Sequence, residues 1–284
     1  MSFSLETVKE LRERTGAGMM DCKKALEESG GDVEKALTSL RKRGLAIAAK
    51  KALRTASEGR VASAVSNDGR RFAIVEVGCE TDFVARTDEF QDYLNKVATI
   101  VVSNAPKDIE SLMSTHVDGA TLSDLQTSLV AKIGENIYVK RFEVVSVGEG
   151  EKAAVYIHAG SKIGVVVLFK DPNSRLTDEL TKEIAMHVAA MSPQFISREH
   201  VPEDYIAKEK GIYLEQLSGE KKPPEILEKI INGKLSKHLS EVCLTEQIFV
   251  KDPEGKKTVK AVLQAADPDA GVLRFIRFEV GEKL

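Results

Sequence analysis

Residues 141–144 read Arg-Phe-Glu-Val, and the same four residues return at positions 277–280. Each string closes a series of elements in the same order: two strand-like runs, a helix with an apolar face, a long connection and a final strand. Four identical residues could match by chance, but the matching order of elements favours an internal duplication. The sequence therefore predicts an α+β core of two related lobes, each with a three-stranded antiparallel sheet backed by helices.

The strand-like runs of the first copy are residues 61–66 and 72–79, and the Asn-Asp-Gly turn signal at 67–69 separates them. The second copy has matching runs at 153–158 and 163–169. In both copies the following helix is expected to end just before a proline. The apolar faces of these two helices consist of Phe90, Leu94, Val97 and Val101, and of Leu180, Ile184, His187 and Val188.

Three short helices are predicted within residues 4–43, ahead of the first lobe. Ser4 and Asp32 are good caps for the first and third of them. The apolar register of the second helix predicts that Met20 faces inward. Helices this short must pack on one another to be stable, and their pattern resembles a ubiquitin-associated-type bundle, a module that usually binds other proteins.

An insertion in the second copy contains two predicted helices, residues 204–217 and 225–239, joined by the polar, proline-containing residues 218–224. Apolar residues at helical spacing on both helices predict an antiparallel helical hairpin of coiled-coil type. Such a hairpin is either an arm that contacts another protein or a packed excursion of the fold. Its placement as an insertion favours the contact role.

A basic stretch, residues 41–54, contains six lysines and arginines and no acidic residue. One interpretation is a contact with phosphates or with an acidic partner. The other is an alanine-rich linker helix that joins the N-terminal helices to the core. The whole chain carries 41 Lys+Arg against 44 Asp+Glu, which favours the linker and argues against a general nucleic-acid coat.

Composition narrows the class of protein. The 284 residues are 42% hydrophobic and 30% charged, as in an ordinary foldable chain. The three cysteines are far apart, so neither a disulfide framework nor a structural zinc site is indicated. The N-terminus lacks an apolar signal-peptide core, and the longest apolar run is far too short to cross a membrane. We expect a cytoplasmic protein without a membrane contact.

No motif for catalysis is present. The sequence has no phosphate-binding glycine loop, no dinucleotide fingerprint, no nucleophile elbow and no histidine pair at zinc-ligand spacing. His187 is interpreted as a core histidine, and the nearby carboxylates Glu76, Glu80 and Asp82 are attributed to strand alternation and loop polarity. We therefore expect no catalytic residue, no cofactor and no metal, and the protein is not expected to be an enzyme.

The segment 79–86, Cys-Glu-Thr-Asp-Phe-Val-Ala-Arg, lies between a predicted strand and a predicted helix. Phe83 could be a hydrophobic staple that packs on its own helix, with Asp82 as the helix cap. It could equally be a side chain presented to a partner, because aromatic residues are strong interface anchors. The residues alone leave both interpretations open.

Five stretches together resemble the bacterial elongation factor Ts family. They are residues 11–26, which include Thr-Gly-Ala-Gly-Met-Met-Asp-Cys, and Thr-Asp-Phe-Val at 81–84, Ala-Lys-Ile-Gly-Glu-Asn at 131–136, Ala-Met-His-Val-Ala-Ala at 185–190 and Phe-Ile-Arg-Phe-Glu-Val-Gly-Glu at 275–282. They occur in family order over nearly the whole chain. The resemblance implies a guanine nucleotide exchange factor for the translational GTPase elongation factor Tu, acting in translation elongation.

The resemblance also implies a domain plan. It comprises a three-helix docking module with its basic linker, the first core lobe, the second core lobe in two parts, and a dimerisation hairpin between those parts. The corresponding ranges are 1–55, 56–147, 148–195 with 241–284, and 196–240. Family members often continue into a further helix that contacts Tu. The sequence stops at Leu284, so that contact is expected to be absent.

By the same resemblance, ten residues match positions that bind Tu: Arg12, Met19, Met20, Thr81, Asp82, Phe83, Val84, Ile133, Gly134 and His158. Asp82 and Phe83 match a loop that enters Tu near its Mg²⁺ and phosphate region. Because Met20 is expected in the bundle core, Met19 is the better contact candidate of the two. The loop after His158 is one residue longer than the family form.

The implied partners are elongation factor Tu, in its GDP-bound and nucleotide-free states, and a second copy of the chain through residues 196–240. No membrane and no specific nucleic acid are expected as partners. The alternative function is an RNA-binding translation accessory protein, motivated by the basic residues 41–54. RNA binding that weakens steeply with salt would favour that alternative.

Overall fold

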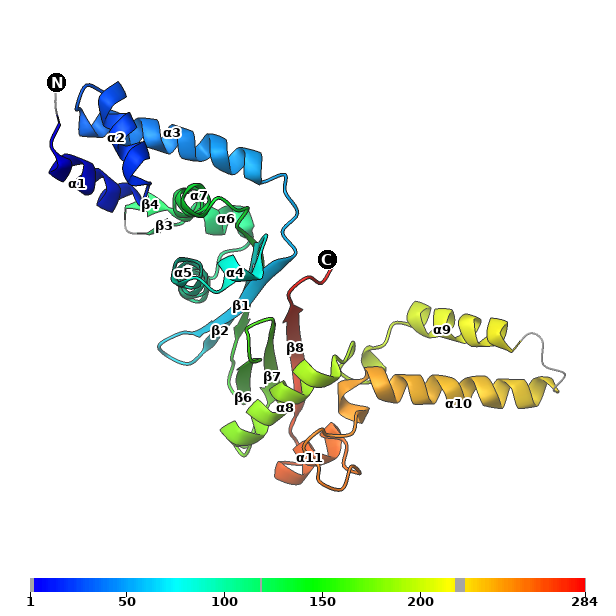
Figure 1. Cartoon of the computed structure of the whole chain (residues 1–284). Coiled ribbons are helices and arrows are strands. Elements are labelled where there is room, and N and C mark those ends of the chain that lie inside the picture. Colours follow the sequence, from blue (N-terminus) through cyan, green and yellow to red (C-terminus); the bar gives the residue numbers. More distant parts are fainter. Residues whose placement is uncertain (1–2, 118, 218–222, 284) are drawn as a thin grey trace. The chain divides into compact units, whose positions relative to one another are not determined.

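A computed structural model describes residues 3–117, 119–217 and 223–283. The chain forms two compact units (Figure 1). The first comprises residues 1–144, 159–163 and 278–284, and the second comprises residues 145–158 and 164–277. Helices and small sheets with antiparallel hairpins occur in both, which confirms the predicted α+β class.

The first unit begins with three helices, α1 (Leu5–Thr15), α2 (Met19–Glu28) and α3 (Val33–Lys51). The predicted caps are confirmed, because the Ser4 side chain accepts a hydrogen bond from the Thr7 N–H and Asp32 accepts one from Lys35. The third helix is longer than the sequence predicted. It continues to Lys51, so most of the basic stretch is a helix that packs along α7 (Leu122–Ile133).

The inward orientation predicted for Met20 is wrong. Its side chain is 73% exposed, whereas Met19 packs against the small core of the three helices. Cys22 and Leu26 define the buried face of α2. Met19 precedes Cys22 by three residues and shares this face, while Met20 is rotated away from it by about 100°.

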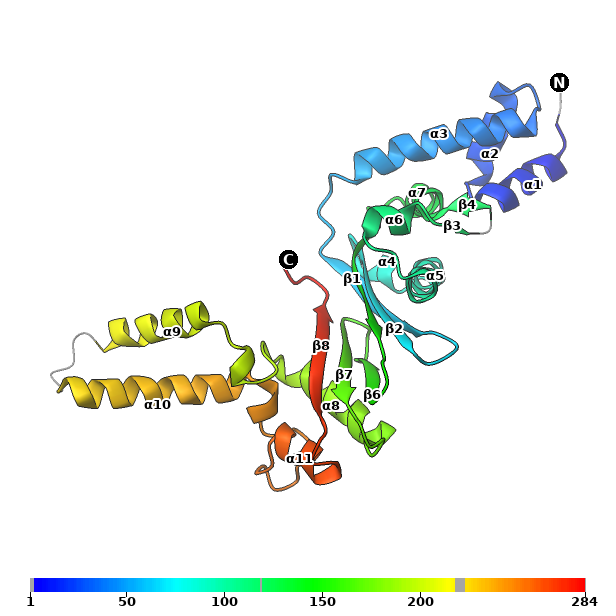
Figure 2. The same ribbon diagram turned by 180° about the vertical axis from the view of Figure 1, so that it is seen from behind.

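The first lobe contains the strands β1 (Glu58–Val65), β2 (Arg71–Cys79) and β5 (Tyr138–Ser146) in the order β1-β2-β5. Strands β1 and β2 form the predicted antiparallel hairpin, and α5 (Asp88–Asn104) packs against both of them (Figure 2). The short helix α4 (Asp82–Ala85) lies between β2 and α5. The connection to β5 contains α6 (Ile109–Met113), β3 (His116–Val117), β4 (Ala120–Thr121) and α7.

The second lobe repeats this order. Its sheet is β6-β7-β8, formed by β6 (Glu151–Ile157), β7 (Ile163–Lys170) and β8 (Gly271–Glu279), and α8 (Asp178–Met191) packs on β6. A helix, α11 (Val259–Ala266), directly precedes the last strand, as α7 does in the first lobe. The caps Ala105 and Ser192 end α5 and α8 with the same left-handed backbone, at φ 45° and 46°. The shared order of elements supports the duplication.

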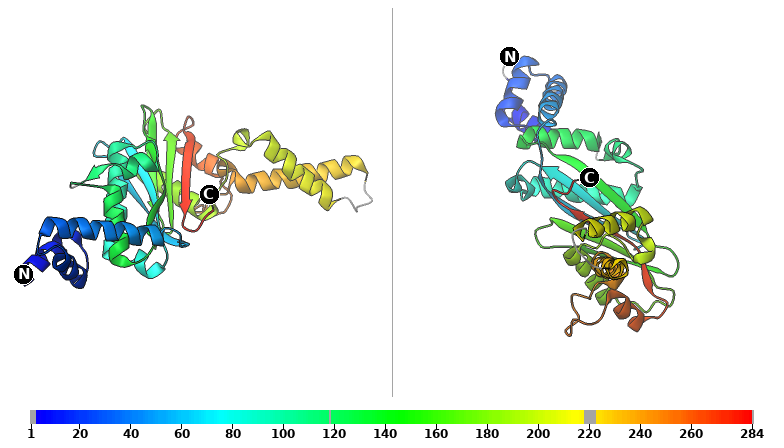
Figure 3. Two further views of the ribbon diagram at one scale, coloured as in Figure 1. Left: turned by 90° about the horizontal axis from the view of Figure 1, so that it is seen from above. Right: turned by 90° about the vertical axis from the view of Figure 1, so that its right-hand side faces the viewer.

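The insertion in the second copy contains α9 (Glu203–Gln216) and α10 (Pro224–Val242), with short 3-10 turns at Arg198–His200 and Leu244–Glu246. The two long helices lie side by side (Figure 3). Ile206 and Tyr213 of α9 pack against Leu235 and Leu239 of α10, the faces that the apolar spacing predicted. Most of the predicted connection, at 218–222, lies outside the described residues. Within the described part of the chain, no helix is both long and apolar enough to cross a membrane.

His187 is fully buried in α8, in agreement with its interpretation as a core histidine. Its Nδ1 accepts a hydrogen bond from the Val250 N–H at 3.1 Å, and its Nε2 lies 3.0 Å from Oε1 of Gln247. The Gln247 amide nitrogen donates to the Glu241 carbonyl, so Oε1 must accept from the histidine. These contacts fit only the neutral ring, and burial lowers the pKa of His187.

We predict that His187 makes the protein less stable in mild acid. Between the ordinary pKa of 6.5 and its lower native value, the unfolded chain binds the extra proton and the native chain does not. The free energy of unfolding should therefore decrease as the pH falls through this window, by up to about 1.4 kcal/mol per pH unit. Urea unfolding at pH 7 and pH 5 measures this, and His187→Gln should remove that component. An equal pH dependence in both proteins contradicts the prediction.

Candidate partner-binding site

Phe83 is presented to solvent by the connection between β2 and α5, here called the Phe83 loop (residues 80–86). Its side chain is 87% exposed, although Val84 beside it packs on the core and Ala85 is fully buried. Thr81 caps α4 and Thr87 caps α5, so Asp82 caps neither helix. The staple interpretation of Phe83 is therefore wrong, because the ring is exposed to solvent. Its contact with a partner stays a prediction.

Glu135 holds the first residues of the Phe83 loop. Its Oε2 accepts hydrogen bonds from the backbone N–H groups of Glu80 at 3.1 Å and Thr81 at 3.0 Å. Its Oε1 accepts from the Thr81 hydroxyl at 2.7 Å. The same hydroxyl oxygen accepts from the Val84 N–H at 3.3 Å, which closes the single turn of α4. One carboxylate thus orients the loop backbone on both sides of Glu80.

The Glu80 side chain in turn accepts a hydrogen bond from the turn that contains Glu135. Its Oε1 accepts from the Asn136 N–H at 2.7 Å, and its Oε2 lies 3.4 Å from the guanidinium of Arg54. The Asn136 N–H, together with the charge of Arg54, lowers the pKa of Glu80. The Asn136 side chain donates to the Arg54 carbonyl at 2.9 Å. The loop, the turn after α7 and the residues after α3 are therefore linked by polar contacts.

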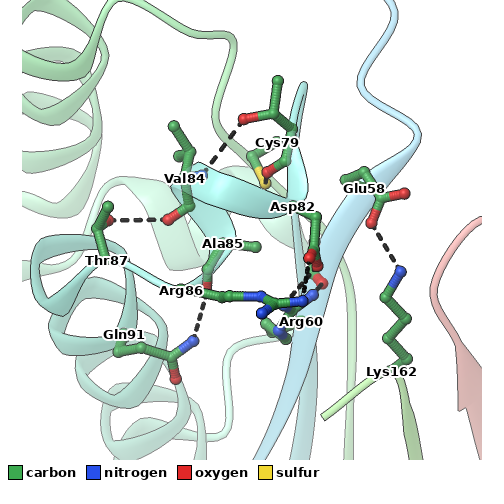
Figure 4. A network of polar contacts seen from close by, with 12 residues as sticks. Glu58, Arg60, Cys79, Asp82, Val84, Ala85, Arg86, Thr87, Gln91 and Lys162 are labelled. Carbon is green, nitrogen blue, oxygen red and sulfur yellow. Dashed lines mark hydrogen bonds and ion pairs between the residues drawn. The ribbon is translucent and has the colours of Figure 1, made fainter. Parts of the chain in front are cut away.

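Asp82 is held by two arginines, as Figure 4 shows. The side chain of Arg60 is only 6% exposed, and it donates to Asp82 at 2.6 Å and to the Gly59 carbonyl at 2.7 Å. The exposed Arg86 binds the other carboxylate oxygen. The hydrogen bond from Arg60 is the largest cause that lowers the pKa of Asp82. The carboxylate therefore stays ionised and anchors the loop at neutral pH.

The remaining backbone of the loop is also fixed (Figure 4). The Thr87 hydroxyl donates to the Val84 carbonyl at 2.8 Å, and the Gln91 amide donates to the Ala85 carbonyl at 2.6 Å. Burial, reinforced by the charge of Glu135, raises the pKa of Cys79 to about 12. Its thiol remains protonated and lies 3.1 Å from the Thr81 carbonyl. Phe83 is thus an exposed apolar side chain on a loop whose backbone has little freedom.

The other expected site residues of the first unit fall into two groups. Ile133 packs on the core, and Gly134 ends α7 at φ 83°, directly before Glu135. Two of the predicted stretches, 81–84 and 133–134, therefore meet through the polar contacts of Glu135. On the N-terminal helices, Arg12 and Met20 are exposed and Met19 is half-buried.

His158 belongs to the second unit. It is exposed, and its Nδ1 lies 3.0 Å from the hydroxyl of Tyr156.

Three cations of the basic stretch have acidic partners within the same unit. Arg41 pairs with Asp124 of α7 at 2.6 Å, Arg43 pairs with Glu28 of α2, and Arg54 pairs with Glu80. Half of the six cations are therefore engaged by acidic side chains of the same unit. This arrangement supports the linker interpretation over a phosphate-binding surface.

Sequence reasoning missed Glu135, Asn136 and Arg60, the residues that hold the Phe83 loop. The first two stand directly after Ile133 and Gly134 in a stretch already singled out, so proximity to expected contacts was an available signal. Arg60 is the single cation of β1, which also contains Glu58 and Ser63. Glu76 was attributed to strand alternation, but it is 2% exposed and pairs with Lys140 and Arg141.

Comparison with known proteins agrees with the earlier resemblance. A family model described as elongation factor TS matches residues 80–282, a range that begins at the first residue of the Phe83 loop. The chain belongs to the elongation factor Ts family. Elongation factor Ts of Thioalkalivibrio sulfidiphilus is 46% identical over 99% of this chain and 93% of its own length. The proteins of that name from Methylococcus capsulatus and Clostridium botulinum are 47% and 46% identical over the same shares.

The range matched by the family model covers most of the site described above. The family model includes the Phe83 loop, the turn at Glu135 and His158. The N-terminal helices precede the matched range, but the alignments with the three relatives cover 99% of the chain and so reach into those helices.

Proposed function

We propose that this protein is a guanine nucleotide exchange factor for elongation factor Tu, and that it releases GDP so that GTP can bind. Membership of the elongation factor Ts family supports the activity. The observation that carries the mechanism is the exposed ring of Phe83 on a fixed loop. The paired basic stretch makes the RNA-binding alternative the weaker explanation of the same sequence.

The proposed mechanism requires no general base or nucleophile. In a GTPase, backbone amides hold the phosphates of GDP, and Mg²⁺ coordinates their oxygens with strict octahedral geometry. Insertion of Phe83 beside that region would stabilise a displaced arrangement of the phosphate-binding elements. Because the factor then binds nucleotide-free Tu more tightly than Tu·GDP, GDP affinity must fall by the same ratio.

The site residues have different proposed roles. Phe83 is the wedge that enters Tu, and Asp82 positions it through Arg60 and Arg86. Thr81 and Val84 shape the loop from within, because one caps α4 and the other packs on the core. Ile133, Gly134 and His158 are proposed as further contacts of the core with Tu. We propose no resident cofactor, because GDP and Mg²⁺ are the ligands of Tu.

We also propose the domain plan of the sequence analysis, with residues 1–55 as a ubiquitin-associated-like docking module. The exposure of the two methionines changes the assignment within it. Met20, at 73% exposure, is the better contact, and Met19 supports the packing of the module. Arg12 is exposed on α1 and completes the proposed docking surface.

We predict that Phe83→Ala slows stimulated GDP release by roughly tenfold or more. Interface anchors of this kind lose about 2 kcal/mol or more on truncation, and about 1.4 kcal/mol corresponds to a factor of ten. The melting temperature should not change, because the ring makes little contact with its own protein. Release of labelled GDP from Tu and thermal unfolding should be measured on one preparation. Val65→Ala, another exposed apolar position of this unit, is the matched control.

A folded Phe83→Ala protein that releases GDP at the wild-type rate would rule out the wedge. A loss of activity that merely follows a loss of folded protein would contradict it as well, because that result assigns Phe83 a structural role.

We predict that Met20→Ala raises the dissociation constant of the complex with Tu about fivefold, which corresponds to about 1 kcal/mol of lost contact. Leu5→Ala, 66% exposed on α1, should leave it unchanged. Met19→Ala should instead lower the melting temperature, because this side chain packs on the module core. Calorimetric titration and thermal unfolding distinguish the two methionines. Equal effects of Met19→Ala and Met20→Ala on binding would refute the assignment.

We propose that residues 196–240 form a dimerisation hairpin. Ile212 and Leu214 of α9 and Ile226 of α10 expose apolar side chains, at 38%, 58% and 47%. Burial of such side chains against a second copy would stabilise a dimer. We predict that Leu214→Asp shifts sedimentation velocity profiles from dimer to monomer at equal concentration. A wild-type chain that stays monomeric as its concentration rises would show that the hairpin has no such role.

A further inference from the structure

The Glu135 carboxylate accepts three hydrogen bonds from the Phe83 loop. Both oxygens are used: one by the N–H groups of Glu80 and Thr81, and the other by the Thr81 hydroxyl. Among the described residues, no lysine or arginine pairs with Glu135. The negative charge of Glu135 is therefore stabilised by three donors, all in residues 80 and 81.

The loop needs this support because it cannot hold its own shape. Helix α4 is only four residues long, and a single helical turn is unstable in isolation. Hydrogen bonds to a carboxylate are about twice as strong as those between neutral groups. Since Glu80 also accepts from the Asn136 N–H, the turn after α7 and the start of the loop hold each other. The position of Phe83 is thus determined by a segment more than fifty residues away.

We propose that Glu135 is a positioning residue for Phe83. Its carboxylate fixes the backbone at Glu80 and Thr81, so that the ring leaves the surface of the free protein in one direction. Arg60 restrains the residue directly before Phe83 through its hydrogen bond to Asp82. The inference rests on the proposed exchange function for its effect on GDP release, but the restraint on the loop exists in the free protein.

Glu135→Gln is the first test, because glutamine keeps the shape of the side chain and removes its charge. The amide must also turn one N–H group toward donors that had faced oxygen, which weakens the contact further. We expect the maximal rate of stimulated GDP release to fall about tenfold, the loss that corresponds to a hydrogen bond with a charged group. Glu110→Gln, an exposed carboxylate on α6, is the matched control and should change nothing.

The second test combines the substitution with Phe83→Ala. If Glu135 acts only through Phe83, Glu135→Gln should cause no further loss of GDP release in the Phe83→Ala protein. An equal fold-loss in both backgrounds would overturn the proposal, because Glu135 would then act by a separate route. If Glu135→Gln does not fold, Thr81→Val replaces it in the same cycle, because it removes the hydroxyl that donates to the carboxylate.

The third test needs no Tu. The sequence contains no tryptophan, so Phe83→Trp introduces a single fluorescent reporter at the position of interest. Adding Glu135→Gln should give this tryptophan a faster local decay of fluorescence anisotropy, measured well below the melting temperature so that the protein is folded. An unchanged anisotropy decay would contradict the proposal that Glu135 restrains the loop. A faster decay together with wild-type GDP release by Phe83→Ala would instead confirm the restraint and refute the proposed wedge.

Discussion

The buried carboxylate of Glu76 is the constraint on which the first lobe depends. It lies on β2, 2% exposed, and pairs with Lys140 at 3.1 Å and Arg141 at 2.6 Å, both on β5. A charge removed from water in this way must keep its partners, because an unpaired buried ion is strongly destabilising. Arg141 also stacks on the ring of Phe278 at 4.1 Å, which joins the two repeated strings. The strand that leads into the Phe83 loop is thereby fixed to its neighbour.

Local patterns were sufficient to predict the elements, and long-range contacts were needed for the details of the site. The caps at Ser4 and Asp32 and the turn at 67–69 depend on a few adjacent residues, so the sequence predicted them. Met20 was misplaced because a ten-residue helix offers two adjacent apolar residues, and only the packed partner decides which one is inside. The contact of Glu135 with Thr81 joins distant segments, and no periodicity reports it.

The two lobes show how a duplicated loop can acquire different properties. In the second copy, the connection after β7 is a closed turn, where the buried Asp171 accepts hydrogen bonds from the N–H groups of Arg175 and Leu176. Its carboxylate belongs to the loop itself. In the first lobe, the loop after β2 is held in part by a carboxylate from a distant segment, Glu135, and it carries an exposed aromatic residue.

The exposure of Phe83 affects the thermodynamics of any complex that covers it. In the free protein the ring is exposed to water, and one isolated apolar residue is too small to drive self-association. Its transfer free energy, about 2 kcal/mol, is released only when a complementary cavity removes the ring from water. Displacing that hydration lowers the heat capacity of the assembled state. The strength of any assembly that covers this ring would therefore depend on temperature.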